Sequence, residues 1–386
     1  MSAITKLVSD TKQANKTFYR TERLEAQTGN DSMKFNYNGI SQFSSIRNTA
    51  SSSTLDRLGF KSEGTNLNLR YQNNTIIADS LFGIKYNLSN FDLNKYGFNH
   101  VTSEKTIGLY QNNNASQLAI LTDGIYKNID FTVNTLDNQT SLLNALSGLN
   151  LTYFKRAPSQ LFDQDAKSLN QRVAKNVSNS NKDFVTITYR VIAPPHSQLY
   201  VSIPNISWSD DNNHSLSITV NGVTRNQVTD NTFDFFDLGY FETESMVTIK
   251  LSFPGNKAIS FDNPSFYALD TQNYQIAMDT INERDSKVTT SNNKVFVDYS
   301  SKTNASLFFT IPYDKGWTAT INHKKVKIQR AQKGFMKVDV PSGKGEVVLT
   351  FIPYGLKTGL LISLLASIIF CCYAYFIRKI TVIQKR

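Results

Sequence analysis

The sequence contains very little cysteine and histidine. Its 386 residues include two cysteines, Cys371 and Cys372, which are adjacent and lie in an apolar stretch near the C-terminus. Residues 1–370 can therefore form neither a disulfide nor a thiolate metal site. The four histidines are scattered and show no spacing typical of metal ligands, so we expect no metal site.

Familiar catalytic motifs are also missing. The chain has no P-loop, no GxSxG and no GxGxxG in a βαβ setting, so we expect no nucleotide and no other cofactor. A glycosidase needs two acids that flank a groove. Asp237, Asp262 and Asp314 are candidates, but no spacing selects a pair. The sequence therefore predicts no catalytic residue.

Negative charge is absent from the end of the chain. The formal net charge is +10, yet no carboxylate follows Glu346. Five cations lie within the last 30 residues: Lys357, Arg378, Lys379, Lys385 and Arg386. The other 356 residues carry +5, which is a mildly basic surface and does not indicate a nucleic-acid partner.

The longest uncharged stretch runs from 358 to 377. Its 20 residues would form a helix of about 30 Å, the thickness of the hydrocarbon core of a bilayer. The cations that follow predict a cytoplasmic C-terminus. We therefore expect a transmembrane helix at 357–377, a cytoplasmic tail at 378–386, the lipid bilayer as a partner, and an extracytoplasmic location for the rest.

The first 22 residues contain no apolar segment that could act as a signal peptide. A C-terminal anchor cannot export a long domain that precedes it. We therefore expect the chain to be the C-terminal piece of a longer membrane protein whose upstream spans carry out the export.

Three helices are expected before the apolar tail. Residues 1–18 form an amphipathic pattern, and residues 268–284 form a second one. A third helix is expected at 141–149, with Asn138 or Thr140 as its cap and a glycine-containing turn at its end.

Short strands with a period of two fill most of the chain after 183, and their pattern occurs twice. LYVSIPNISW (199–208) resembles LFFTIPYDKGW (307–317), and these stretches hold both tryptophans. Proline ends each strand because it has no N–H for the ladder, and Trp317, like Trp208, is expected to open the next strand. Four segment pairs align: 197–204 with 305–312, 216–222 with 318–324, 233–241 with 335–340, and 246–254 with 346–353. We interpret this as one fold built twice, although any two sandwich segments share alternation and turns.

These patterns predict a mainly β fold with some α structure. We expect a mixed α/β N-terminal region, two tandem antiparallel β-sandwich domains of jelly-roll or Ig-like type, and one C-terminal transmembrane helix. The expected boundaries are 1–155 for the N-terminal region, 156–268 for the first sandwich, 269–290 for a linking helix and 291–354 for the second sandwich.

Several motifs, in order, resemble the C-terminal part of the YfhO family of bacterial membrane proteins: FYRTER at 18–23, YNGISQFSS at 37–45, LDRLGF at 55–60, SLFGIKYNLS at 80–89 and IPYDKGW at 311–317. Members are multi-spanning and resemble GT-C glycosyltransferases. The resemblance implies transfer of sugar from a polyprenyl-phosphate carrier to a wall polymer such as lipoteichoic acid, outside the cell. It also implies that the catalytic acid lies on an early loop beyond this chain, so the chain alone should be inactive.

The stretch most suited to face the missing catalytic chamber is YNGISQFSS, whose amide and hydroxyl groups could bind a sugar or phosphate. We predict substrate-binding roles for Tyr37, Asn38, Ser41, Ser44 and Ser45, with Arg20 as an anion partner. A turn that packs two subdomains is the alternative. Asp314 and Lys315 are added because they have no counterpart in the first repeat.

Two other functions stay open. The chain could be a membrane-anchored carbohydrate- or wall-binding module without catalysis, or an anchored hydrolase. The hydrolase has the weaker support because no acid–base pair stands out.

Overall fold

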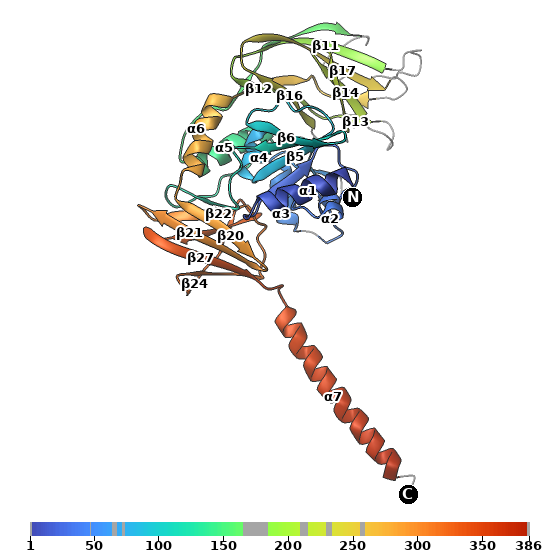
Figure 1. The fold of residues 1–386 in the computed structure, drawn as a ribbon, viewed down its shortest axis with the longest axis vertical. Coiled ribbons are helices and arrows are strands. Elements are labelled where there is room, and N and C mark those ends of the chain that lie inside the picture. Colours follow the sequence, from blue (N-terminus) through green and yellow to red (C-terminus); the bar gives the residue numbers. More distant parts are fainter. Residues whose placement is uncertain are drawn as a thin grey trace.

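The computed structural model describes residues 2–46, 48–63, 68–71, 74–164, 184–208, 215–228, 234–254 and 259–383. A folded body carries one long helix, α7 (Leu356–Ile383), which projects away from it (Figure 1). One β-sandwich lies beside the start of α7, another lies at the far end of the body, and the N-terminal region lies between them. The expected mainly β architecture with added helices is confirmed.

The N-terminal region is built around a four-stranded sheet in the order β1-β5-β7-β6, in which β1 and β5 are parallel. Helix α1 (Ala3–Ala14) covers it with Ile4, Leu7 and Val8, which confirms the amphipathic pattern. A small sheet in the order β2-β4-β3 and three short helices complete the region. The remaining bounds are β1 Arg20–Arg23, α2 Asp31–Phe35, β2 Gln42–Phe43, α3 Thr49–Asp56, β3 Lys61–Glu63, β4 Asn68–Arg70, α4 Ile76–Leu81, β5 Ile84–Ser89, β6 Phe98–Glu104 and β7 Ile107–Asn112.

Helix α5 (Thr135–Ser147) begins earlier than expected. Asn134, rather than Asn138 or Thr140, caps it, because its side chain accepts hydrogen bonds from the N–H groups of Leu136 and Asp137. The predicted cap was wrong, since those two positions lie inside the helix. Gly148 ends the helix in the left-handed conformation (φ 78°), as the sequence indicated. The helix expected at 268–284 is α6 (Thr271–Asn282), with Asp270 as its cap.

The first sandwich packs a five-stranded sheet, β10-β11-β17-β14-β15, against a four-stranded sheet, β16-β12-β19-β9. A short pair, β13-β18, lies beside them. The strands are β9 Phe154–Arg156, β10 Ser159–Gln164, β11 Phe184–Ala193, β12 Ser197–Ile203, β13 Ser207–Trp208, β14 Ser215–Val220, β15 Val223–Val228, β16 Asp234–Phe241, β17 Ser245–Pro254, β18 Ile259–Ser260 and β19 Ser265–Asp270.

The second sandwich packs the sheet β20-β21-β27-β23-β24 against the sheet β25-β26-β22-β8. Strand β8 comes from the N-terminal part of the chain. The strands are β8 Ala119–Leu121, β20 Ser286–Ser291, β21 Lys294–Ser301, β22 Ala305–Phe309, β23 Trp317–Ile321, β24 Lys324–Val326, β25 Gln329–Ala331, β26 Phe335–Val340 and β27 Gly343–Phe351.

The larger sheets of the two sandwiches share one strand order. If the five strands of each larger sheet are numbered along the chain, their spatial order is 1-2-5-3-4 in both. The four aligned segment pairs fall on β12 and β22, β14 and β23, β16 and β26, and β17 and β27. The hairpin turns also agree, because Asn221 and Asn322 both have a φ of 47°. Each amide oxygen accepts from a neighbouring strand, at Thr248 N (3.0 Å) and Glu346 N (2.9 Å) respectively. The smaller sheets share the pairs β12-β16 and β22-β26 but differ at their edges, where β9 and β25 have no counterpart.

Strands β12 and β22 are buried on both faces. Leu199 and Leu307 belong to the cores of their own sandwiches, whereas the next residues, Tyr200 and Phe308, belong to a central core formed with α4, α5 and α6. The repeat therefore docks each sandwich on the N-terminal region through an equivalent aromatic ring.

Trp317 opens β23, as expected, and packs on Phe351 with ring centroids 5.0 Å apart. Trp208 is the second residue of β13 (Ser207–Trp208), not the first residue that was expected. Beyond β27, the segment Leu356–Arg378 of α7 is long and apolar enough to cross a membrane, and none of it is buried against the folded body.

Candidate functional site: the YNGIS loop and its two cavities

The YNGIS loop (Tyr37–Ser41) is held in place by Glu22. Glu22 lies on β1 and is 1% exposed. Its Oε1 accepts hydrogen bonds from Ile40 N and from Ser41 N (3.0 Å), and its Oε2 accepts from Ser41 Oγ (2.8 Å). Ser41 Oγ also accepts from Tyr71 N (3.0 Å). One buried carboxyl group thus fixes the shape of the loop, and sequence reasoning did not identify it.

Glu22 is removed from water, which disfavours its charged form. Burial raises its pKa to about 7, although the hydrogen bonds from Ile40 and Ser41 oppose the shift. The loop therefore rests on a group that changes charge near neutral pH.

The raised pKa of Glu22 makes stability depend on pH. Between the unfolded pKa of 4.5 and the folded value of about 7, the folded state binds more protons, so its free energy of unfolding should fall as pH rises through this window. Across this window the shift lowers the free energy of unfolding by about 3 kcal/mol. In Glu22→Gln this decrease should disappear, because the amide can keep contacts to the loop without titrating. Denaturant unfolding of both proteins at pH 5 and pH 8 measures the difference, and an equal pH dependence would contradict the assignment.

Two cavities flank the loop. Tyr37 and Asn38 line one cavity of about 200 Å³. Lys12, in the last turn of α1, and Asn15 and Lys16, which follow the helix, line it as well. Two lysines and two amides give this cavity a composition suited to an anionic group. Ser41 lines the other, of about 310 Å³, which is bordered by amide and hydroxyl side chains such as Gln27, Thr28 and Asn226. The loop thus separates a cationic cavity from a mixed one, in which Glu25 and Arg70 carry opposite charges beside the amide and hydroxyl groups.

Tyr37 and Asn38 contribute differently to the first cavity. Tyr37 is 9% exposed and packs with Phe35 and α1, and burial raises the pKa of its hydroxyl. Asn38 is exposed, and its Nδ2 donates to Tyr19 O (3.3 Å). Of the two, Asn38 has the more accessible polar group.

Arg20 lies apart from both cavities and is engaged within the protein. Its Nη1 donates to Phe82 O (2.6 Å) and to Thr310 Oγ1 (3.2 Å), and its Nη2 donates to Thr310 O (2.8 Å). Burial lowers its pKa to about 10. This guanidinium links β1 to the end of α4 and to the end of β22 by hydrogen bonds, so its role in the fold is structural.

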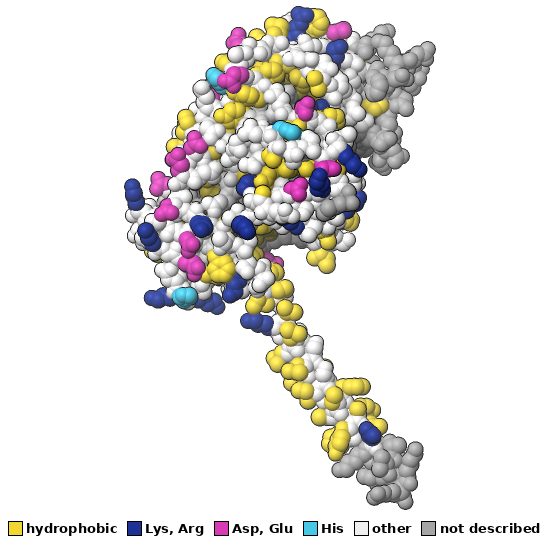
Figure 2. Space-filling view, in the orientation of Figure 1, with side chains coloured by type: hydrophobic (Ala, Val, Ile, Leu, Met, Phe, Trp, Pro, Cys, Tyr) yellow, Lys and Arg dark blue, Asp and Glu magenta, His cyan; other side chains and the backbone are white. Residues whose placement is uncertain are grey.

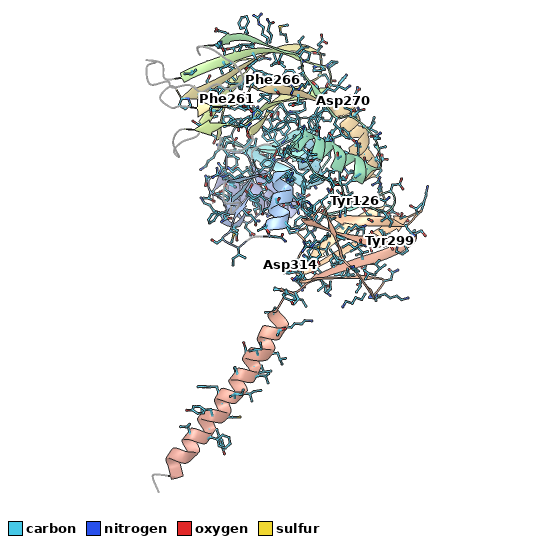
Figure 3. All side chains as sticks on the ribbon, turned by 180° about the vertical axis from the view of Figure 1, so that it is seen from behind. Tyr126, Phe261, Phe266, Asp270, Tyr299 and Asp314 are labelled. Atoms are coloured by element: carbon cyan, nitrogen blue, oxygen red, sulfur yellow. The ribbon has the colours of Figure 1, made fainter. Side chains whose placement is uncertain are left out.

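The remaining predicted residues lie in turns. Ser44 exchanges hydrogen bonds with the backbone of Ile46, and Ser45 is exposed. Asp314 accepts from Gly316 N (2.6 Å) in the turn before β23 and lies close to the start of α7 (Figure 3). Lys315 is exposed, with its ammonium 5.5 Å from the centroid of the Tyr354 ring. The structure therefore brings Tyr37, Asn38 and Ser41 together in one loop, and it places Asp314 and Lys315 near the start of α7.

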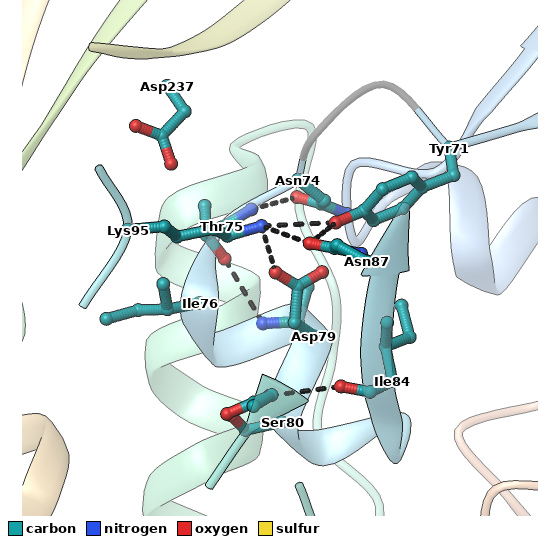
Figure 4. Close-up of polar contacts among 12 residues, drawn as sticks. Tyr71, Asn74, Thr75, Ile76, Asp79, Ser80, Ile84, Asn87, Lys95 and Asp237 are labelled. Atoms are coloured by element: carbon teal, nitrogen blue, oxygen red, sulfur yellow. Dashed lines mark hydrogen bonds and ion pairs between the residues drawn. The ribbon is translucent and has the colours of Figure 1, made fainter. Parts of the chain in front are cut away.

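A buried ion pair between Asp79 and Lys95 was also not identified from the sequence. Lys95 contacts Asp79 and donates to Tyr71 OH (3.1 Å) and Asn87 Oδ1 (3.4 Å) (Figure 4). Asp79 is fully buried, and burial raises its pKa to about 6 against the opposing charge of Lys95. No sequence signal links residues 79 and 95, since their contact depends on how α4 packs on the sheet.

Two solved structures resemble the chain weakly. A cycloisomaltooligosaccharide glucanotransferase of Paenibacillus sp., complexed with cycloisomaltoheptaose, matches with 7% identity and a TM-score of 0.19, covering 55% of this chain and 50% of that one. The tandem CBM22-1–CBM22-2 domain of Paenibacillus barcinonensis Xyn10C matches with 11% identity and a TM-score of 0.19, covering 53% and 91%. At these scores neither likeness carries an argument.

Sequence comparison is more informative. The chain is 25% identical over 135 residues to the uncharacterised protein YfhO of Bacillus subtilis (strain 168), a match that covers 33% of this chain and 16% of that protein. The chain thus corresponds to a small part of that relative. The family described as "Bacterial membrane protein YfhO" matches residues 1–363, which include the N-terminal sheet, both sandwiches and the beginning of α7. On that match, the chain belongs to the YfhO family of bacterial membrane proteins.

Proposed function

We propose that this chain is the extracytoplasmic C-terminal part, with the last span, of a membrane glycosyltransferase. The enzyme would transfer sugar from a polyprenyl-phosphate carrier to a wall polymer such as lipoteichoic acid. The observation that supports this best is the YNGIS loop, which places Asn38 beside a cationic cavity and Ser41 beside a cavity that offers amide and hydroxyl groups. A sugar phosphate offers the same pair of chemistries.

In this proposal the described residues bind and position substrate. Lys12 and Lys16 attract the phosphate, Asn38 and Ser41 offer hydrogen bonds to sugar hydroxyls, and Glu22 keeps the loop in shape. α7 anchors the folded body to the bilayer. Proton transfer and attack at the anomeric carbon are assigned to the membrane portion that the family resemblance implies.

Transfer assays on the gene with its native upstream sequence test the proposal. The protein would be reconstituted in vesicles with a labelled polyprenyl-phosphate sugar and lipoteichoic acid. We expect transfer, and we expect Asn38→Ala and Ser41→Ala to lower it at least about tenfold, the effect of losing one good hydrogen bond in the transition state. Lys325→Ala, on an exposed hairpin of the second sandwich, is the control. Equal rates in all three variants would remove the loop from the active region.

The alternative is a membrane-anchored carbohydrate- or wall-binding module without catalysis. Its support is that both described cavities beside the loop have polar linings, while no acid–base pair is apparent in them. Binding of wall polymer without any transfer in the same vesicles would favour this alternative.

A further inference from the structure

Two cavities adjoin at strand β15, and we refer to them together as the β15 groove. The first is the 310 Å³ cavity beside Ser41, and the second, of about 410 Å³, lies against β14 and β15 of the first sandwich. Gln227 lines both; Asn226, the residue before it, also lines the first cavity, and Arg225 lines the second. The two cavities therefore meet at Gln227, and together they reach from the YNGIS loop to the hairpin turn at Asn221.

The lining of the second cavity combines apolar surface with amides. Phe91, which is 38% exposed, and Val223 present apolar surface, whereas Asn94, Asn221 and Gln227 present amide groups. A pyranose ring has this same division, with C–H groups on its faces and hydroxyl groups at its edge.

The charges along the groove nearly balance. Arg70 and Arg225 oppose Glu25, Asp92 and Asp237. Arg225 is partly occupied, since its Nη2 donates to Asp92 O (2.6 Å). A polyanion would gain little here, because three carboxyl groups would repel it. An uncharged polyhydroxylated chain meets no such penalty.

Asp237 borders the second cavity, but its carboxyl group is enclosed. It is 7% exposed, and its Oδ1 accepts from Gln198 Nε2 (2.7 Å) and from Gly239 N (2.7 Å). Its Oδ2 has no hydrogen-bond partner among the described residues and is shielded from solvent. The polar groups that this cavity offers to a ligand are therefore its amides.

We propose that the β15 groove binds an uncharged oligosaccharide chain of several pyranose units, with one ring packed on Phe91 and its hydroxyl groups bonded to the amides. The first cavity would hold the part of the chain that lies beside Ser41 of the YNGIS loop. The binding step rests on the lining of the groove and does not depend on which polymer accepts sugar in the proposed function.

Binding of defined probes to the full chain in detergent tests this inference. The probes are the β-1,4-linked tetrasaccharides of glucose and of N-acetylglucosamine, the α-1,6-linked glucose tetrasaccharide, and polyglycerol phosphate as the anionic comparison. Gln227→Trp should block the groove where the cavities meet, and Phe91→Ala should remove the ring. Lys325→Trp is the matched control, because it lies on β24, the strand that corresponds to β15 in the second sandwich. Thermal unfolding checks that each variant is folded.

We expect at least one tetrasaccharide to bind, with its Kd at least about tenfold higher in Gln227→Trp and Phe91→Ala and unchanged in Lys325→Trp. Binding of polyglycerol phosphate alone, no binding of any tetrasaccharide, or equal affinity in all variants would overturn the inference. The readout needs no sugar transfer, so oligosaccharide binding without transfer would count against the proposed function only.

Discussion

Lys95→Met is expected to lower the free energy of unfolding by about 3–5 kcal/mol, the usual cost of removing one partner from a buried ion pair. Lys95 and Asp79 are both almost completely enclosed, so the variant would leave a carboxylate without its counter-ion. The ammonium also lies 4.6 Å from the centroid of the Phe98 ring, a contact that the thioether of methionine only partly replaces.

The loss should have a distinctive pH dependence. Burial already raises the pKa of Asp79 from 3.8 to about 6, and removing Lys95 should raise it further. A raised carboxyl pKa favours the folded state at low pH, so the variant should lose less stability at pH 5 than at pH 8. Denaturant unfolding at the two pH values measures this difference.

A second substitution separates charge from packing. Lys95→Met combined with Asp79→Asn should recover part of the loss, because the carboxylate that lost its counter-ion is also removed. Equal stability of the wild type and Lys95→Met at pH 8 would show that the ion pair does not hold the N-terminal region together.

Arg20→Met is expected to cost about 2–5 kcal/mol, because the backbone carbonyls of Phe82 and Thr310 would lose the donors that the guanidinium supplies. Arg20→Lys should recover little, since one ammonium cannot reproduce the planar fork that reaches both carbonyls. Thermal unfolding of the full chain in detergent measures both variants.

This substitution also decides between the two roles considered for Arg20. If Arg20→Met left stability unchanged but weakened the binding of inorganic phosphate, the residue would be an anion partner, as the sequence suggested. A loss of stability with unchanged phosphate binding supports the structural role.

The duplicated fold could be predicted because alternation, the Ile-Pro ends of two strands and their spacing are local features. The second buried face of β12 and β22 could not. Tyr200 and Phe308 sit in stretches that read as ordinary strands, and only the packing of the N-terminal region explains why both positions are aromatic. The cap of α5 could not be predicted either, because Asn134 and Asn138 carry the same side chain and the sequence does not select between them.

The candidate site could also be predicted only where local sequence features marked it. Polar residues in YNGIS marked a surface loop that borders two cavities, but its support, Glu22, lies on a strand with no distinguishing pattern. Gln227 and Asp237 are more than 180 residues from Ser41 in sequence, so only the docking of the first sandwich reveals the groove that they share.

The central claim, an extracytoplasmic folded body anchored by α7, is tested most directly by labelling single cysteines. The chain's two cysteines lie in α7, so Cys371→Ser with Cys372→Ser gives a cysteine-free background for this chain. Lys325→Cys or Lys385→Cys is then added, and intact cells that express the protein from its native locus are treated with a membrane-impermeant maleimide. We predict labelling at position 325 in intact cells and at position 385 only after permeabilisation. The reverse pattern would contradict the account.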